Sequence, residues 1–377
     1  MSTKNYPNIG VVTFPIIESG IVPLSNLLDI LRPLSDDLYL ITGNAGEILV
    51  KKYSGVSFHL VNHKPGTNAF SRIVKFGYTQ LRISFKLARL SRKVDLWFFF
   101  LGETGVLLPM LVAKAVRKRI VLCLAASDIQ MNRAQSEPLL IPLTLISRIN
   151  LSLCNRIVVF TERLITEWGL QKYRNKISIA HTHFLDFDKF KIERPLNKRG
   201  DIVGYIGRLS QEKGIMNFVA AIPKICELKT DIKILIGGDG PLRPQIEKRL
   251  SESLPNGKVE LVGWIPHEKL PRYLNRLKLL VVPSYTEAGP IIMLEAMACG
   301  TPVLATPVGT IPDVIRDAET GFVMTENSPE CIIKNVISVL DYPDLDRIAQ
   351  NARAFVESEF TFETAVEGYR SLLREFL

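Results

Sequence analysis

The sequence has few cysteines, and their spacing fits neither a disulfide framework nor a metal site. Five cysteines occur in 377 residues, they form no C-x-x-C pair, and each lies among apolar neighbours. An odd number with no such spacing argues against disulfides and against a structural zinc site. We therefore expect buried thiols in a reducing compartment. They are Cys123, Cys154, Cys226, Cys299 and Cys331.

The sequence also lacks an apolar run long enough to cross a membrane. The strongest candidate, residues 96–116, contains Glu103, Pro109 and two glycines. A spanning helix needs about 20 predominantly apolar residues. The first residues carry one lysine and a short apolar run, so we expect a first strand there and no secretion signal. These features predict a cytoplasmic protein.

Acidic residues are absent from residues 48–94, which contain ten lysines and arginines. Residues 1–200 carry 28 basic and 14 acidic residues, whereas residues 201–377 carry 19 basic and 24 acidic residues. This asymmetry indicates that the two halves meet different partners. Aromatic residues do not interleave with the cations, and no recognition module is present, so we expect no nucleic-acid partner.

A helix with a cationic stripe is predicted over residues 70–93. The stripe steps by three, four or seven positions, which at about 100° per residue is one helical face. One apolar face can meet the core, and the apolar residues beside the stripe can contact anionic lipid head groups. A solvated helix is the alternative. The separate core face is Phe70, Val74, Gly77, Leu81, Phe85 and Ala88; beside the stripe lie Phe76, Ile83, Leu87 and Leu90; the cations are Arg72, Lys75, Arg82, Lys86, Arg89 and Lys93.

Apolar, often β-branched runs recur along the chain, with helix-like stretches between most of them. They are continuous and not alternating, which is typical of strands buried on both faces of a parallel sheet. The pattern and the length predict an α/β protein with two Rossmann-like, doubly wound domains facing across a cleft. A polar linker at 191–201 separates residues 1–192 from residues 193–360. The runs are 9–14, 38–42, 96–101, 119–124, 156–160, 201–207, 233–238, 277–284 and 302–306.

Three glycine-containing loops follow predicted strands of the second half. In "GYIGRLSQEKG", Arg208 and Lys213 can converge on one anion, although a solvated basic loop would also fit. "IGGDGP" places loop glycines before a helix start, which is weak evidence for a phosphate site. Trp264 in "LVGWIP" is more often a packing residue than a base-stacking one.

A fourth loop, "PSYTEAGPIIMLEAMACG", carries two carboxylates eight positions apart. Pro290 suits the first turn of a helix that ends at Gly300, so Glu287 lies in the loop and Glu295 inside the helix. The helix start can bind phosphate, and each carboxylate can accept hydrogen bonds from a diol. Together these groups outline a site for a sugar nucleotide. A solvated Glu287 and an ion-paired, buried Glu295 are the alternative.

These segments, in order, resemble glycosyltransferase family four, whose members are retaining enzymes of the GT-B fold. The resemblance rests on "GRLSQEKG", "GGDGPL", "LVGWIPHEKLPRYL", "PSYTEAGPIIMLEAMACGTPVLATPVGTIPDVI" and "AETGFVM", and it covers roughly the second half. It implies that Arg208 and Lys213 bind the donor diphosphate, that Glu287 holds the sugar and that Glu295 holds the ribose. It further implies backbone contacts at Gly207, Gly238, Gly240, Trp264, Ile265, Ala288, Gly289, Pro290, Ile291 and Ile292, and a terminal helix (361–377) that returns to the first domain.

The first half matches the family less well. Gly20 is the only glycine where members often have a glycine-rich loop, Ala125 and Ala126 stand where many have a histidine, and Glu103 can reach the cleft. The expected function is transfer of a sugar, of hexosyl type, from a nucleotide-diphosphate sugar to a lipid-linked or glycan acceptor in cell-surface glycan synthesis. The enzyme would lie at the inner face of the membrane and need no metal or other cofactor. The alternatives are a catalytically silent sugar-nucleotide-binding protein and another sugar enzyme, such as an epimerase or phosphorylase.

Overall fold

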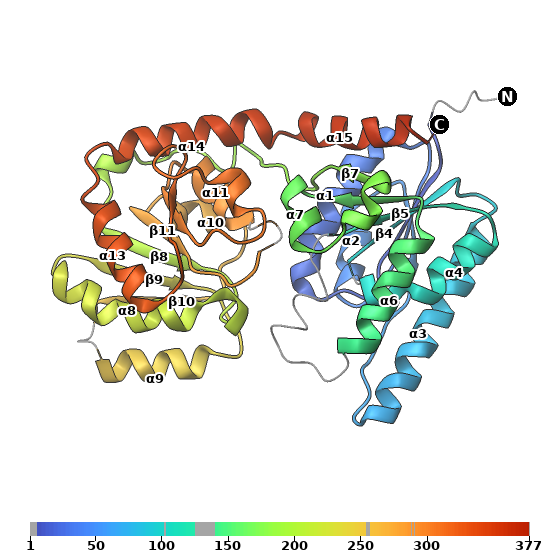
Figure 1. The fold of residues 1–377 in the computed structure, drawn as a ribbon, viewed down its shortest axis with the longest axis horizontal. Coiled ribbons are helices and arrows are strands. Elements are labelled where there is room, and N and C mark those ends of the chain that lie inside the picture. The colour runs from blue at the N-terminus through green and yellow to red at the C-terminus, as the bar shows by residue number, and fades with distance from the viewer. Residues whose placement is uncertain are drawn as a thin grey trace. The chain divides into compact units, whose positions relative to one another are not determined.

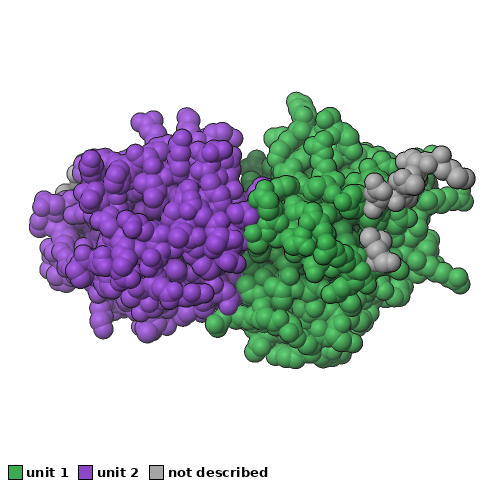
Figure 2. All heavy atoms as spheres, turned by 90° about the horizontal axis from the view of Figure 1, so that it is seen from above, with its two compact units in different colours: residues 1–183, 362–377 green, residues 184–361 purple. Residues whose placement is uncertain are grey.

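The computed structural model describes residues 6–101, 103–124, 140–253, 257–287, 289 and 291–376. The chain forms two compact units, coloured separately in Figure 2: unit 1 is residues 1–183 with 362–377, and unit 2 is residues 184–361. Each unit is a parallel sheet with helices packed on it, as Figure 1 shows. The predicted fold class, two doubly wound α/β domains, is confirmed.

Unit 1 is built on a seven-stranded parallel sheet with the strand order β3-β2-β1-β4-β5-β6-β7. The order reverses between β1 and β4, which is the topological switch point of a doubly wound sheet. The central strands are buried because helices cover them, and this explains their continuous apolar runs. The strands are β1 (Ile9–Val12), β2 (Leu38–Thr42), β3 (Val56–Leu60), β4 (Leu96–Phe100), β5 (Arg119–Cys123), β6 (Arg156–Val159) and β7 (Ile177–Ile179).

The last helix of the chain completes the core of unit 1. Tyr369, on this helix, is fully buried and lies beside Phe98, with their ring centroids 6.1 Å apart. Burial raises the pKa of the Cys123 thiol to about 12, and a hydrogen bond with Tyr369 lowers it only partly. The helices of unit 1 are α1 (Ile21–Leu31), α2 (Leu49–Lys52), α3 (Ala69–Leu90), α4 (Leu107–Ala115), α6 (Leu140–Leu153), α7 (Glu162–Glu167) and α15 (Phe362–Arg374).

Unit 2 is built on a six-stranded parallel sheet with the order β10-β9-β8-β11-β12-β13. Here the order reverses between β8 and β11, so the loops that follow these two strands leave the sheet at its switch point. The strands are β8 (Ile202–Ile206), β9 (Lys233–Gly237), β10 (Val259–Gly263), β11 (Leu279–Val282), β12 (Val303–Ala305) and β13 (Phe322–Val323). The helices are α8 (Ile215–Leu228), α9 (Arg243–Ser253), α10 (Leu270–Leu274), α11 (Ile291–Ala298), α12 (Ile311–Val314), α13 (Pro329–Leu340) and α14 (Leu345–Glu359).

The segment 191–201, predicted as a linker, lies within unit 2, since the units divide after residue 183. Arg199 fixes it there. Its buried guanidinium donates to the carbonyl oxygens of Leu277 and Cys299 and to the Thr301 hydroxyl, at 2.7–3.0 Å. Burial lowers the pKa of Arg199 to about 10, and these acceptors compensate the buried charge. A segment that is polar in sequence is therefore an anchored part of the fold.

Helix α3, predicted over residues 70–93, is present but ends at Leu90, and its predicted core face is wrong. Ile83, Leu87 and Leu90, expected beside the cations, are buried in the core. Phe70 and Phe85, expected in the core, are 78% and 69% exposed. Two polar residues account for the difference. The Thr79 hydroxyl is 2.8 Å from Nδ1 of His63, and Gln80 Oε1 accepts from the Leu108 amide at 2.9 Å, so this polar side packs inward with its hydrogen bonds made.

Each of the nine predicted strands is present in the structure. The runs did not indicate β3, β7, β10 or β13, all of which lie at sheet edges, and β3 has the half-polar sequence VSFHL. Within the described ranges, none of the helices combines the length and the apolar character that a membrane span requires.

Candidate functional site

The loop after β8 contacts the loop after β11 through a glycine that no other residue could replace without strain. Gly214 has a φ of 66°, and a Cβ there would lie 1.8 Å from the carbonyl oxygen of Pro283. The two loops therefore touch backbone to backbone beside the switch point of the sheet. The contact also places Lys213, the residue before Gly214, next to the segment that carries Glu287.

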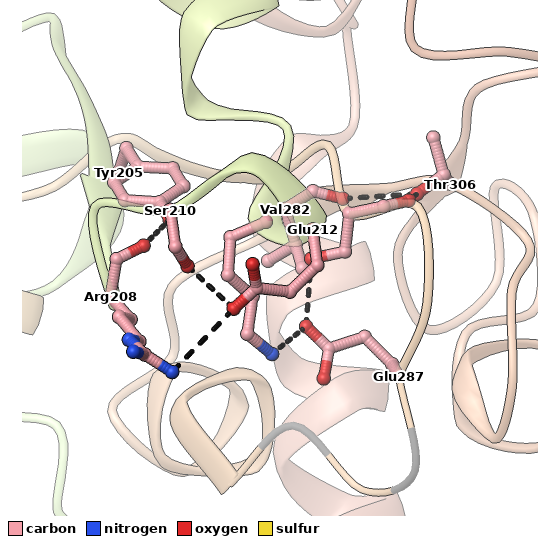
Figure 3. A network of polar contacts seen from close by, with 9 residues as sticks. Tyr205, Arg208, Ser210, Glu212, Val282, Glu287 and Thr306 are labelled. Atoms are coloured by element: carbon pink, nitrogen blue, oxygen red, sulfur yellow. Dashed lines mark hydrogen bonds and ion pairs between the residues drawn. The ribbon is translucent and has the colours of Figure 1, made fainter. Parts of the chain in front are cut away.

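Lys213 and Glu287 form the central ion pair of unit 2. Lys213 Nζ lies 2.7 Å from Glu287 Oε1, and the Ser284 hydroxyl donates to the same oxygen at 2.7 Å (Figure 3). The Glu287 side chain is only 7% exposed and that of Lys213 is 30% exposed. Because one carboxylate oxygen receives both bonds, the other keeps its acceptor capacity. The arrangement joins a cation to an acceptor within one small site.

Backbone packing fixes the position of Glu287. Gly309 has a φ of 56°, and a Cβ there would lie 1.5 Å from the Glu287 carbonyl oxygen. The Thr306 hydroxyl donates to the Ser284 carbonyl oxygen at 2.5 Å. The loop after β12 therefore packs against the loop after β11. These contacts hold the Glu287 carboxylate in place before any ligand binds.

Arg208 lies on the other side of this loop cluster. Its Nη1 is 3.9 Å from Glu212 Oε1, which accepts from the Ser210 hydroxyl at 2.6 Å. The Tyr205 hydroxyl donates to the Arg208 carbonyl oxygen at 2.7 Å. Burial, followed by the charges of Glu287 and Glu212, raises the pKa of Tyr205, so the phenol stays protonated as a donor. The Arg208 guanidinium itself is largely exposed and can reach an anion.

Glu295 belongs to a different polar network of unit 2. His267 Nε2 lies 2.6 Å from Glu295 Oε1, and Lys189 Nζ lies 2.9 Å from His267 Nδ1. Lysine can only donate, so Nδ1 accepts and Nε2 carries the proton toward the carboxylate. The ring of His267 also packs on Phe190, with centroids 5.3 Å apart. Glu295 is thus a buried carboxylate held in place by an imidazole.

Glycines of the other two loops allow close approach of backbone to backbone. Gly238 has a φ of 126°, and a Cβ there would lie 1.8 Å from the Gly207 carbonyl oxygen. A Cβ on Gly240 would lie 2.5 Å from the Leu209 carbonyl oxygen. In the neighbouring loop, Trp264 is 68% exposed and Ile265 is buried. The exposed indole is therefore no part of the core, contrary to the packing interpretation.

The helix start between the two carboxylates is only partly described. Helix α11 begins at Ile291 and continues through Ile292 and Glu295, as predicted. Gly289 has a φ of 155°, close to the extended region. Ala288 and Pro290 lie outside the described residues.

The predicted acceptor-side residues belong to unit 1. Gly20 lies in unit 1, where a Cβ would meet Ile16 and Leu101 at 3.2 Å, so it is a packing position. Glu103 opens a short 3-10 helix of the same unit. Ala125 and Ala126 lie outside the described residues. No group of three His, Cys, Asp or Glu suited to a metal ion occurs within the described part of the chain.

Several polar residues of the site were not predicted. Ser284 and Glu212 lie inside the quoted motifs, but their roles depend on which oxygen each contacts. His267 and Lys189 are 78 residues apart, and nothing in their local sequence links them. Their meeting depends on the tertiary fold alone.

The chain is similar in sequence to known proteins. The family described as glycosyl transferases group 1 matches residues 186–355. Alpha-D-kanosaminyltransferase of Streptomyces kanamyceticus is 30% identical over 46% of this chain and 45% of its own length. N-acetyl-alpha-D-glucosaminyl L-malate synthase of Bacillus anthracis is 23% identical over 98% of this chain and 97% of its own. The chain spans about half the length of the first of these curated relatives.

Solved structures resemble the chain over nearly its full length. Anabaena HepE, crystallised with UDP and glucose, has a TM-score of 0.78 and 15% identity, covering 98% of this chain and 100% of its own. Sucrose-phosphate synthase of Thermosynechococcus elongatus has a TM-score of 0.77 and 20% identity, covering 98% and 99%. The fold is therefore shared across both units, and the family match falls on the unit that holds the Lys213–Glu287 pair. Residues 186–355 thus match the glycosyl transferases group 1 family, and the two units share the GT-B fold of these solved structures.

Proposed function

We propose that this protein transfers a sugar, with retention of configuration, from a nucleotide-diphosphate sugar to a lipid-linked or glycan acceptor. The Lys213–Glu287 ion pair carries the proposal. It puts a cation and a buried hydroxyl acceptor at the switch point of the sheet, beside the start of α11. Ligands of open α/β sheets bind at such points. A diphosphate beside Lys213 and a sugar beside Glu287 would match both groups.

The chemistry of the proposed step follows from where charge develops. As the bond between the anomeric carbon and the diphosphate oxygen breaks, negative charge grows on the leaving nucleoside diphosphate. Lys213 and Arg208 would stabilise that charge, since fixed cations act most strongly where charge appears in the transition state. The sugar becomes oxocarbenium-like. The acceptor hydroxyl attacks the same face, and its proton goes to the departing phosphate oxygen, so no enzyme nucleophile is needed.

Glu295 would hold the ribose. Its carboxylate is buried, and one of its oxygens already accepts a hydrogen bond from Nε2 of His267. The second oxygen can accept from a ribose hydroxyl. The backbone near Ile265 would meet the base, with the exposed Trp264 at its edge. UDP occupies the HepE crystals, which makes UDP the first nucleotide to test here.

The acceptor part of the proposal concerns a membrane. Helix α3 exposes apolar side chains next to a row of cations, and residues 48–94 contain no acidic residue. Such a surface suits the inner leaflet, where anionic lipids concentrate. A lipid-linked acceptor would then be presented to the enzyme at the membrane surface.

Two measurements test the sugar-transfer proposal. First, thermal unfolding is followed with UDP, ADP, GDP and UDP-sugars, because a ligand that binds the native state raises the midpoint. Second, the donor so identified is supplied with a labelled sugar and a membrane extract. Labelled glycolipid or glycan is the expected product. Tight binding without any labelled product would favour the catalytically silent alternative, and undiminished transfer by Glu287→Gln would contradict the role given to that carboxylate.

A further inference from the structure

The exposed apolar side of α3 and its cations are arranged as adjacent strips. At about 100° per residue, with Phe70 set to zero, five exposed apolar residues fall at about 0–80° and four cations at about 100–160°, whereas exposed Ile73, in the first turns of the helix, falls at about 300°. The core side of the helix follows from about 180° onward. A helix with this order of strips can lie flat on a bilayer, with its third side still packed on the protein. The apolar strip is Phe70, Leu81, Val74, Phe85 and Tyr78, and the adjacent cations are Arg89, Arg82, Lys75 and Lys86.

The cationic strip borders an open groove between α3 and the edge strand β3. The groove is lined by His59 of β3 and by Phe85, Lys86, Arg89, Leu90 and Lys93. No described carboxylate lines it. Phe85 belongs both to the groove and to the apolar strip, so the two surfaces are continuous. A ligand in the groove would meet three lysine or arginine side chains together with the apolar side chains of Phe85 and Leu90.

His59 reports on the field inside this groove. Burial, followed by the charges of Lys86 and Lys93, lowers the pKa of His59. On its own strand, Nε2 of His59 lies 3.2 Å from the Ser57 hydroxyl. The groove is thus positive and lacks a counter-ion from the described chain. An anion placed there would be attracted by Lys86, Arg89 and Lys93 together.

We propose that this groove binds the phosphate head group of an anionic membrane lipid while the apolar strip of α3 enters the bilayer. The occupant follows from charge and shape. A free phosphate would contact only the cations, whereas a phospholipid would contact the cations with its head group and Phe85, which also belongs to the apolar strip, with its apolar part. The inference rests on the membrane contact proposed above and is independent of sugar transfer.

The test uses the full-length protein and sedimentation with vesicles of phosphatidylcholine, with or without phosphatidylglycerol. Wild type is expected to bind only the anionic vesicles. Replacing three groove cations by glutamine (Lys86, Arg89 and Lys93) should weaken that binding on the order of 100-fold, because each cation near an anionic surface contributes about fivefold. A matched control replaces three exposed lysines elsewhere (Lys172, Lys248 and Lys334) and carries the same net charge. The control is expected to bind as wild type does.

A second pair of variants tests the apolar strip. Phe70→Ser, Leu81→Ser and Phe85→Ser together should reduce vesicle binding by more than about tenfold, since buried apolar area is lost. In the matched control, three other exposed residues are replaced by serine: Ile179, Ile192 and Leu228. This control is expected to bind the vesicles as wild type does. In addition, the pKa of His59 followed by NMR should rise with phosphatidylglycerol micelles and change less with inorganic phosphate at equal concentration.

Three results would overturn the inference. They are equal binding to neutral vesicles, equal loss in the groove and control variants, and a His59 pKa that does not respond to the lipid. Measuring how far UDP shifts the unfolding midpoint of the groove variant tests donor binding separately from lipid binding. A groove variant that keeps the UDP shift but loses the vesicles supports the lipid site. If wild type binds the vesicles but gives no nucleotide shift, only the donor proposal fails.

Discussion

Neutralising Glu287 should separate the binding of the diphosphate from the binding of the sugar. In the free protein, the Lys213 ammonium lies 2.7 Å from the Glu287 carboxylate, whose side chain is 7% exposed. In the proposed donor site, a diphosphate would compete with this carboxylate for Lys213. Glu287→Gln keeps the size of the side chain and the capacity to accept from Ser284, but it removes the competing charge.

The size of the effect follows from the bond that changes. A hydrogen bond to a charged group contributes about 1.5–3 kcal/mol and a neutral one about 0.5–1.5 kcal/mol, so about 1–1.5 kcal/mol of competition is released. At about 1.4 kcal/mol per factor of ten, UDP should bind about 5–10-fold more tightly to the variant. UDP-glucose gains the same binding free energy from the release of Lys213, but it loses the charged acceptor for its sugar hydroxyls. The ratio of UDP-glucose to UDP affinity should therefore fall about 5–10-fold.

Isothermal titration calorimetry with UDP and UDP-glucose measures both affinities. If another nucleotide raises the unfolding midpoint more than UDP does, that nucleotide and its sugar conjugate are used instead. Glu260→Gln is the matched control, because Glu260 is also ion-paired in unit 2, to Arg276 at 2.6 Å, but is exposed. The control should change neither affinity. If Glu287→Gln weakened UDP and UDP-glucose equally, Glu287 would act only by holding the loop, and the reasoning would fail.

Four further outcomes are expected. Gly214→Ala should lower the unfolding midpoint and weaken UDP binding, because φ is 66° and the new Cβ would meet a carbonyl oxygen; calorimetry and titration measure both. Arg199→Met should cost about 3–5 kcal/mol in urea unfolding, since several buried acceptors lose their donor. Partly exposed Cys331 should react first with a thiol reagent at mildly alkaline pH, whereas Cys123, whose pKa burial raises to about 12, should react only after unfolding. His267→Ala should raise the Kd for UDP about tenfold by freeing the Glu295 side chain, and it should also lower the unfolding midpoint because the buried carboxylate loses its donor; an unchanged Kd would rule out a positioning role.

The strands and the loop motifs could be predicted because they depend on local sequence. A strand buried on both faces is apolar throughout, as in residues 96–100. Glycines such as Gly214 and Gly238 mark backbone conformations that other residues adopt only with strain. The nearness of Lys213 and Glu287 follows from two such motifs, because a parallel sheet brings the loops after β8 and β11 to one edge, but the ion pair between them was not predicted.

The errors have a common physical origin in tertiary contacts. Helix α3 offers two apolar faces, and periodicity does not say which one packs; Thr79 and Gln80 decide it through partners on other elements. The polar segment 191–201 had the composition of a linker, but Arg199 finds its acceptors more than seventy residues away. His267, which holds Glu295, likewise meets its partners Glu295 and Lys189 only through the tertiary fold. Long-range hydrogen bonds of this kind leave no trace in local sequence.

The division of the chain also fixes the order in which the two units can be finished during synthesis. Unit 2 is one continuous stretch, whereas unit 1 needs residues 362–377 in addition to its first 183. Domains generally fold as units while the chain emerges. The later part of the protein can therefore fold first, and the earlier part must wait for Tyr369 to fill its core. Until then, unit 1 would expose apolar surface to the ribosome and to chaperones.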